Sequence, residues 1–325
     1  MEPLIFSPLL KRIRWGGRRL ETLLGKSIGP EQDYAESWEI CDHGADQCHV
    51  LSGPYRDWPL SRLVAECGVE LFGEPARFSQ FPLLIKFLDC HDRLSVQVHP
   101  DDEAARRFKP RENGKTEAWV VIDAQPGSVI YAGLRLGVVA EDLRAALSDG
   151  SLENLLHRIS PAVGDCYFIP AGTVHALGEG VVVAEVQQSS DMTFRLYDWG
   201  HLDSEGNSRP LHIEEAFACI DFQQGPVAPT RPRMVNSDAG WQIEQLVVCP
   251  YFRMFRHGLS RAGELPRQPV CRVLMSLSGS GMLEWGQKSY ALPRGQTCLL
   301  PASCPRLELR PTSPTPWQFL VAEVV

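Results

Sequence analysis

The stretch GDCYFIPAGTVH, residues 164–175, joins a short run of strand-forming residues to a bent turn that ends at a histidine. Asp165–Ile169 is mostly apolar and aromatic, as expected of a strand. Pro170 and Gly172 are residue types that bend the backbone, so the chain should turn inward before His175. A neutral imidazole held in this way is a common ligand of divalent metals. The stretch therefore predicts a β-rich fold in which His175 is a candidate metal ligand.

The order of glycine, proline, glycine and histidine in this stretch resembles the second sequence motif of the cupin β-barrels. A weaker copy, GQTCLLPASCPR, lies at residues 295–306. In that copy, Ser303 and Arg306 stand where the first stretch has its second glycine and its histidine. Two lobes of one barrel type explain this repeat most simply. We expect the second lobe to bind no metal and to serve packing.

A second stretch, SVQVHPDD at residues 95–102, alternates polar and apolar side chains. In a strand, Ser95, Gln97 and His99 would share one face, because successive side chains point to opposite sides. The cupin first motif has two histidines two residues apart, followed by a glutamate. Here Gln97 and His99 form that pair, and Glu117 in GKTEAWVV is the later glutamate. With His175 they make a set of two imidazoles, one carboxylate and one amide, which suits zinc or another borderline divalent metal.

Further polar residues are expected to face the same interior. Lys115 has the same parity as Glu117 and should point the same way. In VVVAEVQQSSDMTFRLYDWG, residues 181–200, Glu185 and Gln187 alternate with apolar neighbours, and Arg195 follows on the next segment. A buried Glu185 would need a partner or a function, since an unpaired carboxylate is costly to bury.

Several stretches together resemble the type I mannose-6-phosphate isomerases in their short bacterial form. The resemblance runs from about residue 10 to residue 220, and the last ninety residues fit only loosely, as a second cupin lobe. It is carried by WGG (15–17), ESWEI (36–40), FPLLIKFLDCHDRLSVQVHPDD (81–102), GKTEAWVV (114–121), IPAGTVHAL (169–177) and SSDMTFRLYDWG (189–200).

The resemblance implies a role for each matching residue. It places one zinc ion per chain on Gln97, His99, Glu117 and His175. It makes Arg195, Glu185 and Lys115 the catalytic residues, and it places Lys86 and Ser95 near the sugar phosphate. The large helical insertion of the family is reduced here to residues 139–159, which changes the lid over the site.

The implied reaction interconverts mannose 6-phosphate and fructose 6-phosphate by moving a proton between C2 and C1 through a cis-enediol. A cation near the two substrate oxygens would stabilise the negative charge of the enediolate. We favour Glu185 as the general base; Lys115 and a water on the metal are alternatives. Rival functions are a non-catalytic metal-binding sugar sensor, a cupin isomerase acting on another sugar, and an iron oxygenase, against which Gln97 speaks.

The segment pattern predicts a mainly β protein of two cupin-like β-barrel (jelly-roll) lobes with a few helices. We expect a catalytic lobe at 1–225, a linker at 226–240 and a lobe without metal at 241–325. Helices are expected over Leu60–Leu71, as a pair within Val139–Ile159, and after a cap at Asp101 or Asp102. Expected strands include 83–88, 94–99, 118–122, 128–131, 165–169, 181–187, 192–197, 241–248, 252–257, 270–277, 280–285, 296–300 and 317–324.

The composition excludes some classes of function. The net charge of −8, from 40 acidic and 32 basic residues, argues against a nucleic-acid-binding protein. No apolar run is long enough to span a membrane, and the N-terminus does not look like a secretory signal. The ten cysteines are scattered without a Cys-x-x-Cys pair, which favours a reducing compartment. We expect a cytoplasmic enzyme for a sugar phosphate, as a monomer or small homo-oligomer.

Overall fold

The computed structural model describes residues 1–202, 205–238 and 240–325, and the fold is mainly β, as predicted. Residues 203–204 of the expected catalytic lobe and residue 239 of the expected linker lie outside the described residues. The helices are α1 (Arg19–Thr22), α2 (Leu60–Glu66), α3 (Gly68–Phe72), α4 (Asp102–Phe108), α5 (Ala140–Asp149), α6 (Ile213–Phe217) and the 3-10 helix η1 (Leu152–Leu155).

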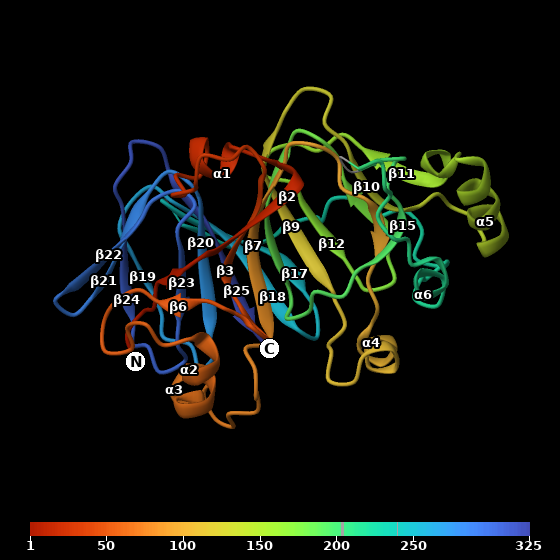
Figure 1. Ribbon diagram of the computed structural model, residues 1–325. Coiled ribbons are helices and arrows are strands. Elements are labelled where there is room, and N and C mark those ends of the chain that lie inside the picture. The colour runs from red at the N-terminus through yellow and green to blue at the C-terminus, as the bar shows by residue number, and fades with distance from the viewer. Residues whose placement is uncertain (203–204, 239) are drawn as a thin grey trace. The chain divides into compact units, whose positions relative to one another are not determined.

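The strands fall into two series along the chain (Figure 1). The first series is β1 (Phe6–Ser7), β2 (Leu9–Gly17), β3 (Tyr34–Ile40), β4 (Asp42–His43), β5 (Asp46–Gln47), β6 (His49–Val50), β7 (Leu83–Cys90), β8 (Val96–Val98), β9 (Glu117–Ala124), β10 (Ile130–Leu134), β11 (Leu156–Ile159), β12 (Cys166–Ile169), β13 (His175–Leu177), β14 (Val181–Gln188) and β15 (Phe194–Tyr197). The second is β16 (Arg233–Asp238), β17 (Trp241–Val248), β18 (Phe252–Leu259), β19 (Gly263–Leu265), β20 (Arg272–Ser278), β21 (Gly281–Trp285), β22 (Lys288–Leu292), β23 (Thr297–Leu300), β24 (Leu307–Pro311) and β25 (Trp317–Val324).

The chain forms two compact units that are not contiguous in sequence. One unit comprises residues 1–12, 18–87 and 230–325, and the other comprises residues 13–17 and 88–229. In the first unit, the N-terminal residues bond to the C-terminal lobe: Leu4 and Leu299 form a β-bridge, and Lys288 pairs with Glu2. These long-range contacts explain why this grouping differs from the contiguous lobes expected from the sequence.

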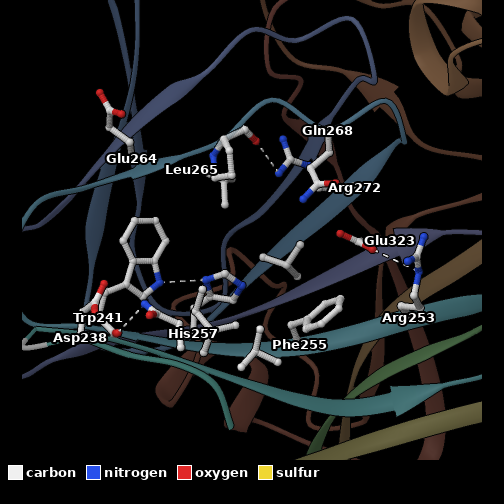
Figure 2. Close-up of a pocket in the computed structure, with 15 residues that line it drawn as sticks. Asp238, Trp241, Arg253, Phe255, His257, Glu264, Leu265, Gln268, Arg272 and Glu323 are labelled. Carbon is white, nitrogen blue, oxygen red and sulfur yellow. Dashed lines mark hydrogen bonds and ion pairs between the residues drawn. The ribbon is translucent and has the colours of Figure 1, made fainter. Parts of the chain in front are cut away.

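The C-terminal lobe of the first unit consists of two open sheets around one core. Their strand orders are β16-β17-β18-β25-β20-β23 and β19-β24-β21-β22. Buried side chains from both sheets, among them Leu274, Leu283 and Phe319, belong to one apolar cluster. Part of the segment expected to be a linker is instead β16, which pairs with β17. This lobe also contains a pocket of about 530 Å³, lined from β16 to β25 (Figure 2).

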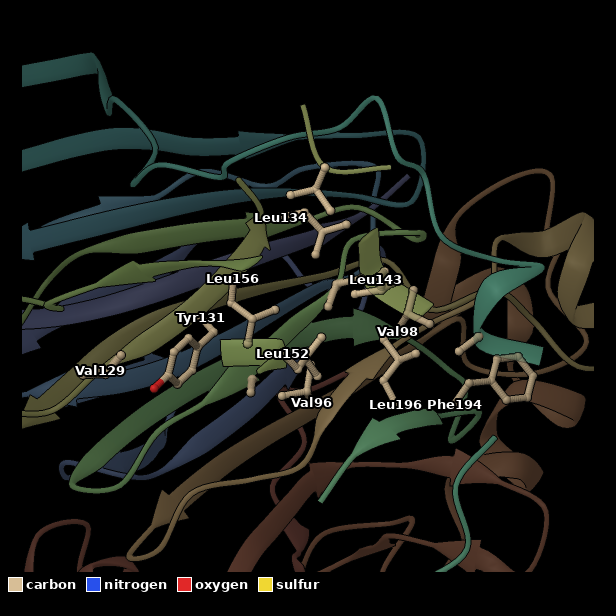
Figure 3. Packing of buried hydrophobic residues seen from close by; sticks show 14 residues of the cluster. Val96, Val98, Val129, Tyr131, Leu134, Leu143, Leu152, Leu156, Phe194 and Leu196 are labelled. Carbon is tan, nitrogen blue, oxygen red and sulfur yellow. The ribbon is translucent and has the colours of Figure 1, made fainter. Parts of the chain in front are cut away.

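The second unit contains the five-stranded sheet β11-β10-β13-β8-β15 and the run β12-β9-β14. Val96 and Val98 on β8 belong to an apolar cluster with Leu143 of α5 and Ala216 of α6 (Figure 3). Figure 1 shows both helices beside this sheet. The helices therefore cover the apolar face of β8, and alternation on this strand puts Gln97, which is half-buried, on the opposite face.

Three expectations about fold differ from the structure. In the described part of the chain every sheet is open, so the predicted barrels do not form as closed sheets. Leu60–Leu71 is interrupted at Cys67, which leaves the helical conformation before Gly68 begins α3. The predicted helical pair forms only in part: Gly150 ends α5 in the left-handed conformation, and the second member is the short 3-10 helix η1, followed by β11. No helix among the described residues has the length and apolar character to cross a membrane.

One predicted helix start is confirmed. Asp101 is the N-cap of α4, and its side chain accepts a hydrogen bond from the backbone N–H of Ala104 at 2.7 Å. Asp102 lies in the first turn, where its carboxylate accepts from the N–H of Gly114 at 2.8 Å. Both carboxylates satisfy backbone donors, which is the usual task of an N-terminal acidic residue.

Candidate metal centre and the polar site around it

Three predicted site residues form one row across the five-stranded sheet. Gln97 on β8 is the register partner of His175 on β13 and of Arg195 on β15. Directly opposed residues on neighbouring strands point to the same face. Because the other face of β8 is packed under α5 and α6, this row faces the interior of the unit. His99 directly follows β8 and is two residues from Gln97, so alternation directs the two side chains to the same face.

Backbone carbonyls fix the tautomers of both buried histidines. His175 Nδ1 lies 2.9 Å from the carbonyl oxygen of Thr173, and His99 Nδ1 lies 3.0 Å from that of Met192. A carbonyl oxygen only accepts, so each Nδ1 carries a proton and donates. Each Nε2 therefore presents a lone pair. This is the arrangement that orients metal-binding histidines in proteins.

The two Nε2 atoms converge on the carboxylate of Glu117. Each of them lies 3.4 Å from one of its oxygens, and the ligand atoms of the three residues lie within 4.8 Å of one another. The amide of Gln97 lies beside them, with Nε2 3.3 Å from His175 Nε2. Rotating this amide by half a turn would present its oxygen instead. All four predicted ligands thus lie together.

Burial and Lys115 set the charges of this cluster. Lys115 Nζ lies 2.9 Å from His99 Nε2 and 3.0 Å from Glu117 Oε2. Burial, helped by this ammonium, lowers the pKa of His99 to about 3, and burial also lowers the pKa of His175. Burial opposes ionisation of Glu117, but Lys115 holds the pKa of its carboxyl well below the usual value. The cluster is therefore two neutral imidazoles and one carboxylate.

This donor set fits a divalent metal. Two imidazole lone pairs, a carboxylate and an adjacent amide are the nitrogen and oxygen donors that zinc and similar ions prefer. The ammonium of Lys115, held between His99 and Glu117, shows that these atoms attract a cation. A buried carboxylate and imidazoles in neutral form need no further deprotonation to bind a metal.

Glu185 is held by Trp119, a residue that the sequence motifs do not indicate as part of a site. It lies opposite Trp119 in the β14–β9 register, and Trp119 Nε1 donates to Glu185 Oε2 at 2.8 Å. Both side chains are buried. The indole also meets the His175 ring edge to face, with 5.4 Å between ring centroids. Trp119 thus contacts a candidate ligand and the candidate base. Its parity with Lys115 and Glu117 was the available signal in the sequence.

The remaining predicted residues, Arg195, Ser95 and Lys86, each have a polar partner. In the second unit, Arg195 Nε donates to Ser95 Oγ at 3.3 Å, and Arg195 Nη1 donates to the carbonyl of Pro210 at 2.8 Å. In the first unit, Lys86 is buried on β7 and pairs with Glu36 at 3.2 Å. The structure therefore places Arg195 and Ser95 in contact, and their roles in a site stay predictions. The role of Lys86 stays a prediction.

Family models and curated relatives that match this chain all describe mannose-6-phosphate isomerases, also called phosphomannose isomerases. A model of the phosphomannose isomerase type I catalytic domain matches residues 4–126, and one of the mannose-6-phosphate isomerase cupin domain matches residues 242–312. The chain is 36% identical over 300 residues to a mannose-6-phosphate isomerase of Streptococcus mutans, covering 92% of each chain. It is also 36% identical over 305 residues to mannose-6-phosphate isomerase ManA of Bacillus subtilis, covering 92% of this chain and 93% of that protein.

A solved structure is also similar along its full length. The crystal structure of the mannose 6-phosphate isomerase from Bacillus subtilis matches with a TM-score of 0.91 and 32% identity, and the match covers 100% of both chains. The likeness therefore includes the C-terminal lobe, which the sequence motifs matched only loosely.

Proposed function

The chain belongs to the mannose-6-phosphate isomerase family and is an isomerase, and on this premise we propose that it interconverts mannose 6-phosphate and fructose 6-phosphate with zinc as its metal. The proton moves between C2 and C1 of the sugar through a cis-enediol. The observation that supports this most directly is the convergence of two imidazole Nε2 atoms on a buried carboxylate.

His99, Glu117, His175 and the amide oxygen of Gln97 would hold the zinc. A zinc ion there would supply a Lewis acid for the negative charge that develops on the sugar oxygens. Lys115 contributes a second positive charge next to the carboxylate, 3.0 Å from Glu117 Oε2. Because the imidazoles are neutral, the cluster with its zinc and Lys115 would have a net positive charge. That charge suits an anionic substrate and an enediolate.

Glu185 takes the proton from the sugar carbon in this proposal. Its carboxylate is buried, and the Trp119 indole N–H fixes the orientation of one oxygen at 2.8 Å. A base held by a rigid donor loses little orientational freedom when the substrate binds. Lys115, whose Nζ lies 3.0 Å from Glu117 Oε2, is the alternative base and would act through its unprotonated amine.

Arg195 stabilises the negative charge that develops on the enediolate in this proposal, and Ser95 beside it contacts the sugar phosphate. Their 3.3 Å contact places a guanidinium and a hydroxyl side by side in the row that contains Gln97. Lys86 is proposed as a further phosphate contact on the resemblance alone. Arg195→Ala should lower turnover and leave the metal bound; loss of the metal from this variant would make Arg195 structural.

The compartment, lobe boundaries, oligomeric state and partners of the enzyme are also proposals. The ten cysteines form no disulfide in the described part of the chain, which suits a reducing compartment such as the cytoplasm. We propose residues 1–225 as the catalytic lobe, 226–240 as the connection, although its residues 233–238 form β16, and 241–325 as a lobe without metal. The working form would be a monomer or a small homo-oligomer, and sugar phosphates rather than nucleic acids or membranes would be its partners.

Metal analysis and a coupled assay test this function together. The purified protein should contain close to one zinc per chain, and it should convert mannose 6-phosphate until a chelator removes the metal. Activity that survives complete removal of the metal would overturn the zinc role. A protein that binds zinc but converts neither mannose 6-phosphate nor a related sugar would instead be a metal-binding sugar sensor.

A further inference from the structure

The C-terminal lobe contains a pocket that the isomerase site does not use. Its volume is about 530 Å³, within the range of pockets that bind small molecules. Its residues come from β16, β17, β18, β20 and β25 and from the segment around β19 (Figure 2). Phe255, Leu265 and Val321 make part of its wall apolar, and Gln268 and Arg272 add polar groups.

Arg272 is the unusual member of this wall, because its guanidinium is buried and incompletely bonded. The residue is 2% exposed at the start of β20. Its Nη1 donates to the carbonyl oxygen of Pro266 at 3.1 Å, whereas Nε and Nη2 have no hydrogen-bond partner. Nε–H and Nη2–H lie on one edge of the guanidinium and point in parallel. This edge matches the two oxygens of a carboxylate or phosphate.

Glu323 is the carboxylate whose charge acts on Arg272, and it has another partner. Glu323 pairs with Arg253 at 3.3 Å, on the same pocket wall (Figure 2). Among the described residues, no carboxylate lies within ion-pair distance of Arg272. Burial is the main reason that the pKa of Arg272 is lowered, although the group stays cationic. A buried cation with two unused donors is unfavourable, and an anion bound at that edge would relieve it.

His257 supplies a further donor in the same pocket. Its Nδ1 accepts the indole N–H of Trp241 at 3.1 Å, and burial, together with Arg272, lowers its pKa to about 3. The neutral ring must therefore carry its proton on Nε2, which makes Nε2 a donor. The carboxylates of Asp238, Glu264 and Glu323 also line the pocket, so the guanidinium edge and the imidazole donor mark the part that suits the anionic end of a small molecule, and the apolar wall suits its body.

We propose that this pocket binds a small anionic molecule whose carboxylate or phosphate group pairs with the Nε–Nη2 edge of Arg272 and whose apolar part lies against Phe255, Leu265 and Val321. The second lobe then has a ligand site of its own in addition to its packing role. This inference does not depend on the isomerase activity, and its test uses binding alone.

Benzoate, benzamide and inorganic phosphate serve as the probes, added to the full-length protein. Benzoate joins a carboxylate to a flat apolar ring, and benzamide is its neutral counterpart. Binding is followed by calorimetry and by the indole N–H signal of Trp241, which a Trp241→Phe variant assigns. Arg272→Met removes the guanidinium at similar size. Arg310→Met is the matched control, because Arg310 lies on β24 of the same lobe and is exposed.

Benzoate or phosphate should bind the wild-type protein and shift the Trp241 signal. Affinity for that probe should fall by about tenfold or more in Arg272→Met and stay unchanged in Arg310→Met. Benzoate binding would identify the ligand as a carboxylate, whereas phosphate binding alone would identify it as a phosphate. The proposal is wrong if neither anion binds, if benzamide binds as well as benzoate, or if Arg272→Met binds like the wild type. Should Arg272→Met fail to fold, Arg272→Lys keeps the charge without the parallel donors and should bind at least severalfold more weakly.

Discussion

Trp119→Phe is the substitution that most directly tests how the site positions its base. The change keeps an aromatic ring against His175, which meets Trp119 edge to face, and it removes the indole N–H together with part of the fused ring. That N–H donates to Glu185 Oε2 at 2.8 Å between two buried side chains. The variant therefore separates the orientation of Glu185 from the packing of the metal ligands.

The size of the effect follows from this one hydrogen bond. A hydrogen bond to a charged group contributes about 1.5–3 kcal/mol, and a buried carboxylate that loses its donor is left partly unsatisfied. If that energy is needed to hold Glu185 in its reactive orientation, kcat should fall by about ten- to a hundredfold. KM should change little, because the indole donates to the proposed base and not to the residues proposed to hold the phosphate.

The assay is steady-state turnover of mannose 6-phosphate, together with the zinc content and the melting temperature. Trp317→Phe is a matched control, since Trp317 is also buried and its indole N–H donates to Ser276 Oγ at 2.9 Å in the C-terminal lobe. Both variants should lose stability, and only Trp119→Phe should lose turnover. Equal kcat values for the two variants, or loss of zinc from Trp119→Phe, would refute this account of Trp119.

Three further predictions concern the metal, a helix cap and acid stability. His175→Ala should lose the metal in elemental analysis, whereas His49→Ala, which changes an exposed histidine, should keep it. Asp101→Ala should lower the free energy of unfolding by about 1 kcal/mol in urea titrations, because it removes the cap of α4; a loss no larger than that of Glu103→Ala would contradict this. Burial lowers the pKa of His257 to about 3, so unfolding takes up a proton between the ordinary histidine pKa and that value, and stability falls as the pH falls. His257→Gln should reduce this loss in the free energy of unfolding by about 1.4 kcal/mol per pH unit over that window. Identical pH profiles of stability for the variant and the wild type would exclude this role of His257.

The sequence identified the candidate ligands because their positions follow local rules. Alternation within SVQVHPDD assigned Gln97 and His99 to one face, and the spacing of glycine and proline before His175 indicated a bent turn. Parity also paired Lys115 with Glu117, which lie 3.0 Å apart. These inferences needed only neighbours along the chain. The metal itself and the roles of Glu185 and Arg195 stay proposals.

Local rules were insufficient where chain segments far apart in sequence meet. The pairing of Leu4 with Leu299 makes the N-terminus part of the same unit as the C-terminal lobe, and no periodicity predicts that partner. The predicted linker likewise did not anticipate β16, whose residues become a strand by pairing with β17. Strand pairing depends on which partners are available in space, so composition alone misplaces such segments.

By itself, the sequence determined the β-rich character of the protein and the set of side chains that share each strand face, because both follow from periodicity along the chain. Only the tertiary structure decided what meets those side chains. It brought Trp119 to Glu185, set the carbonyls of Thr173 and Met192 against two imidazoles, and left one edge of Arg272 without a partner. Hydrogen bonds and burial between distant segments depend on three-dimensional packing, and they fix the protonation and orientation of the groups that do chemistry.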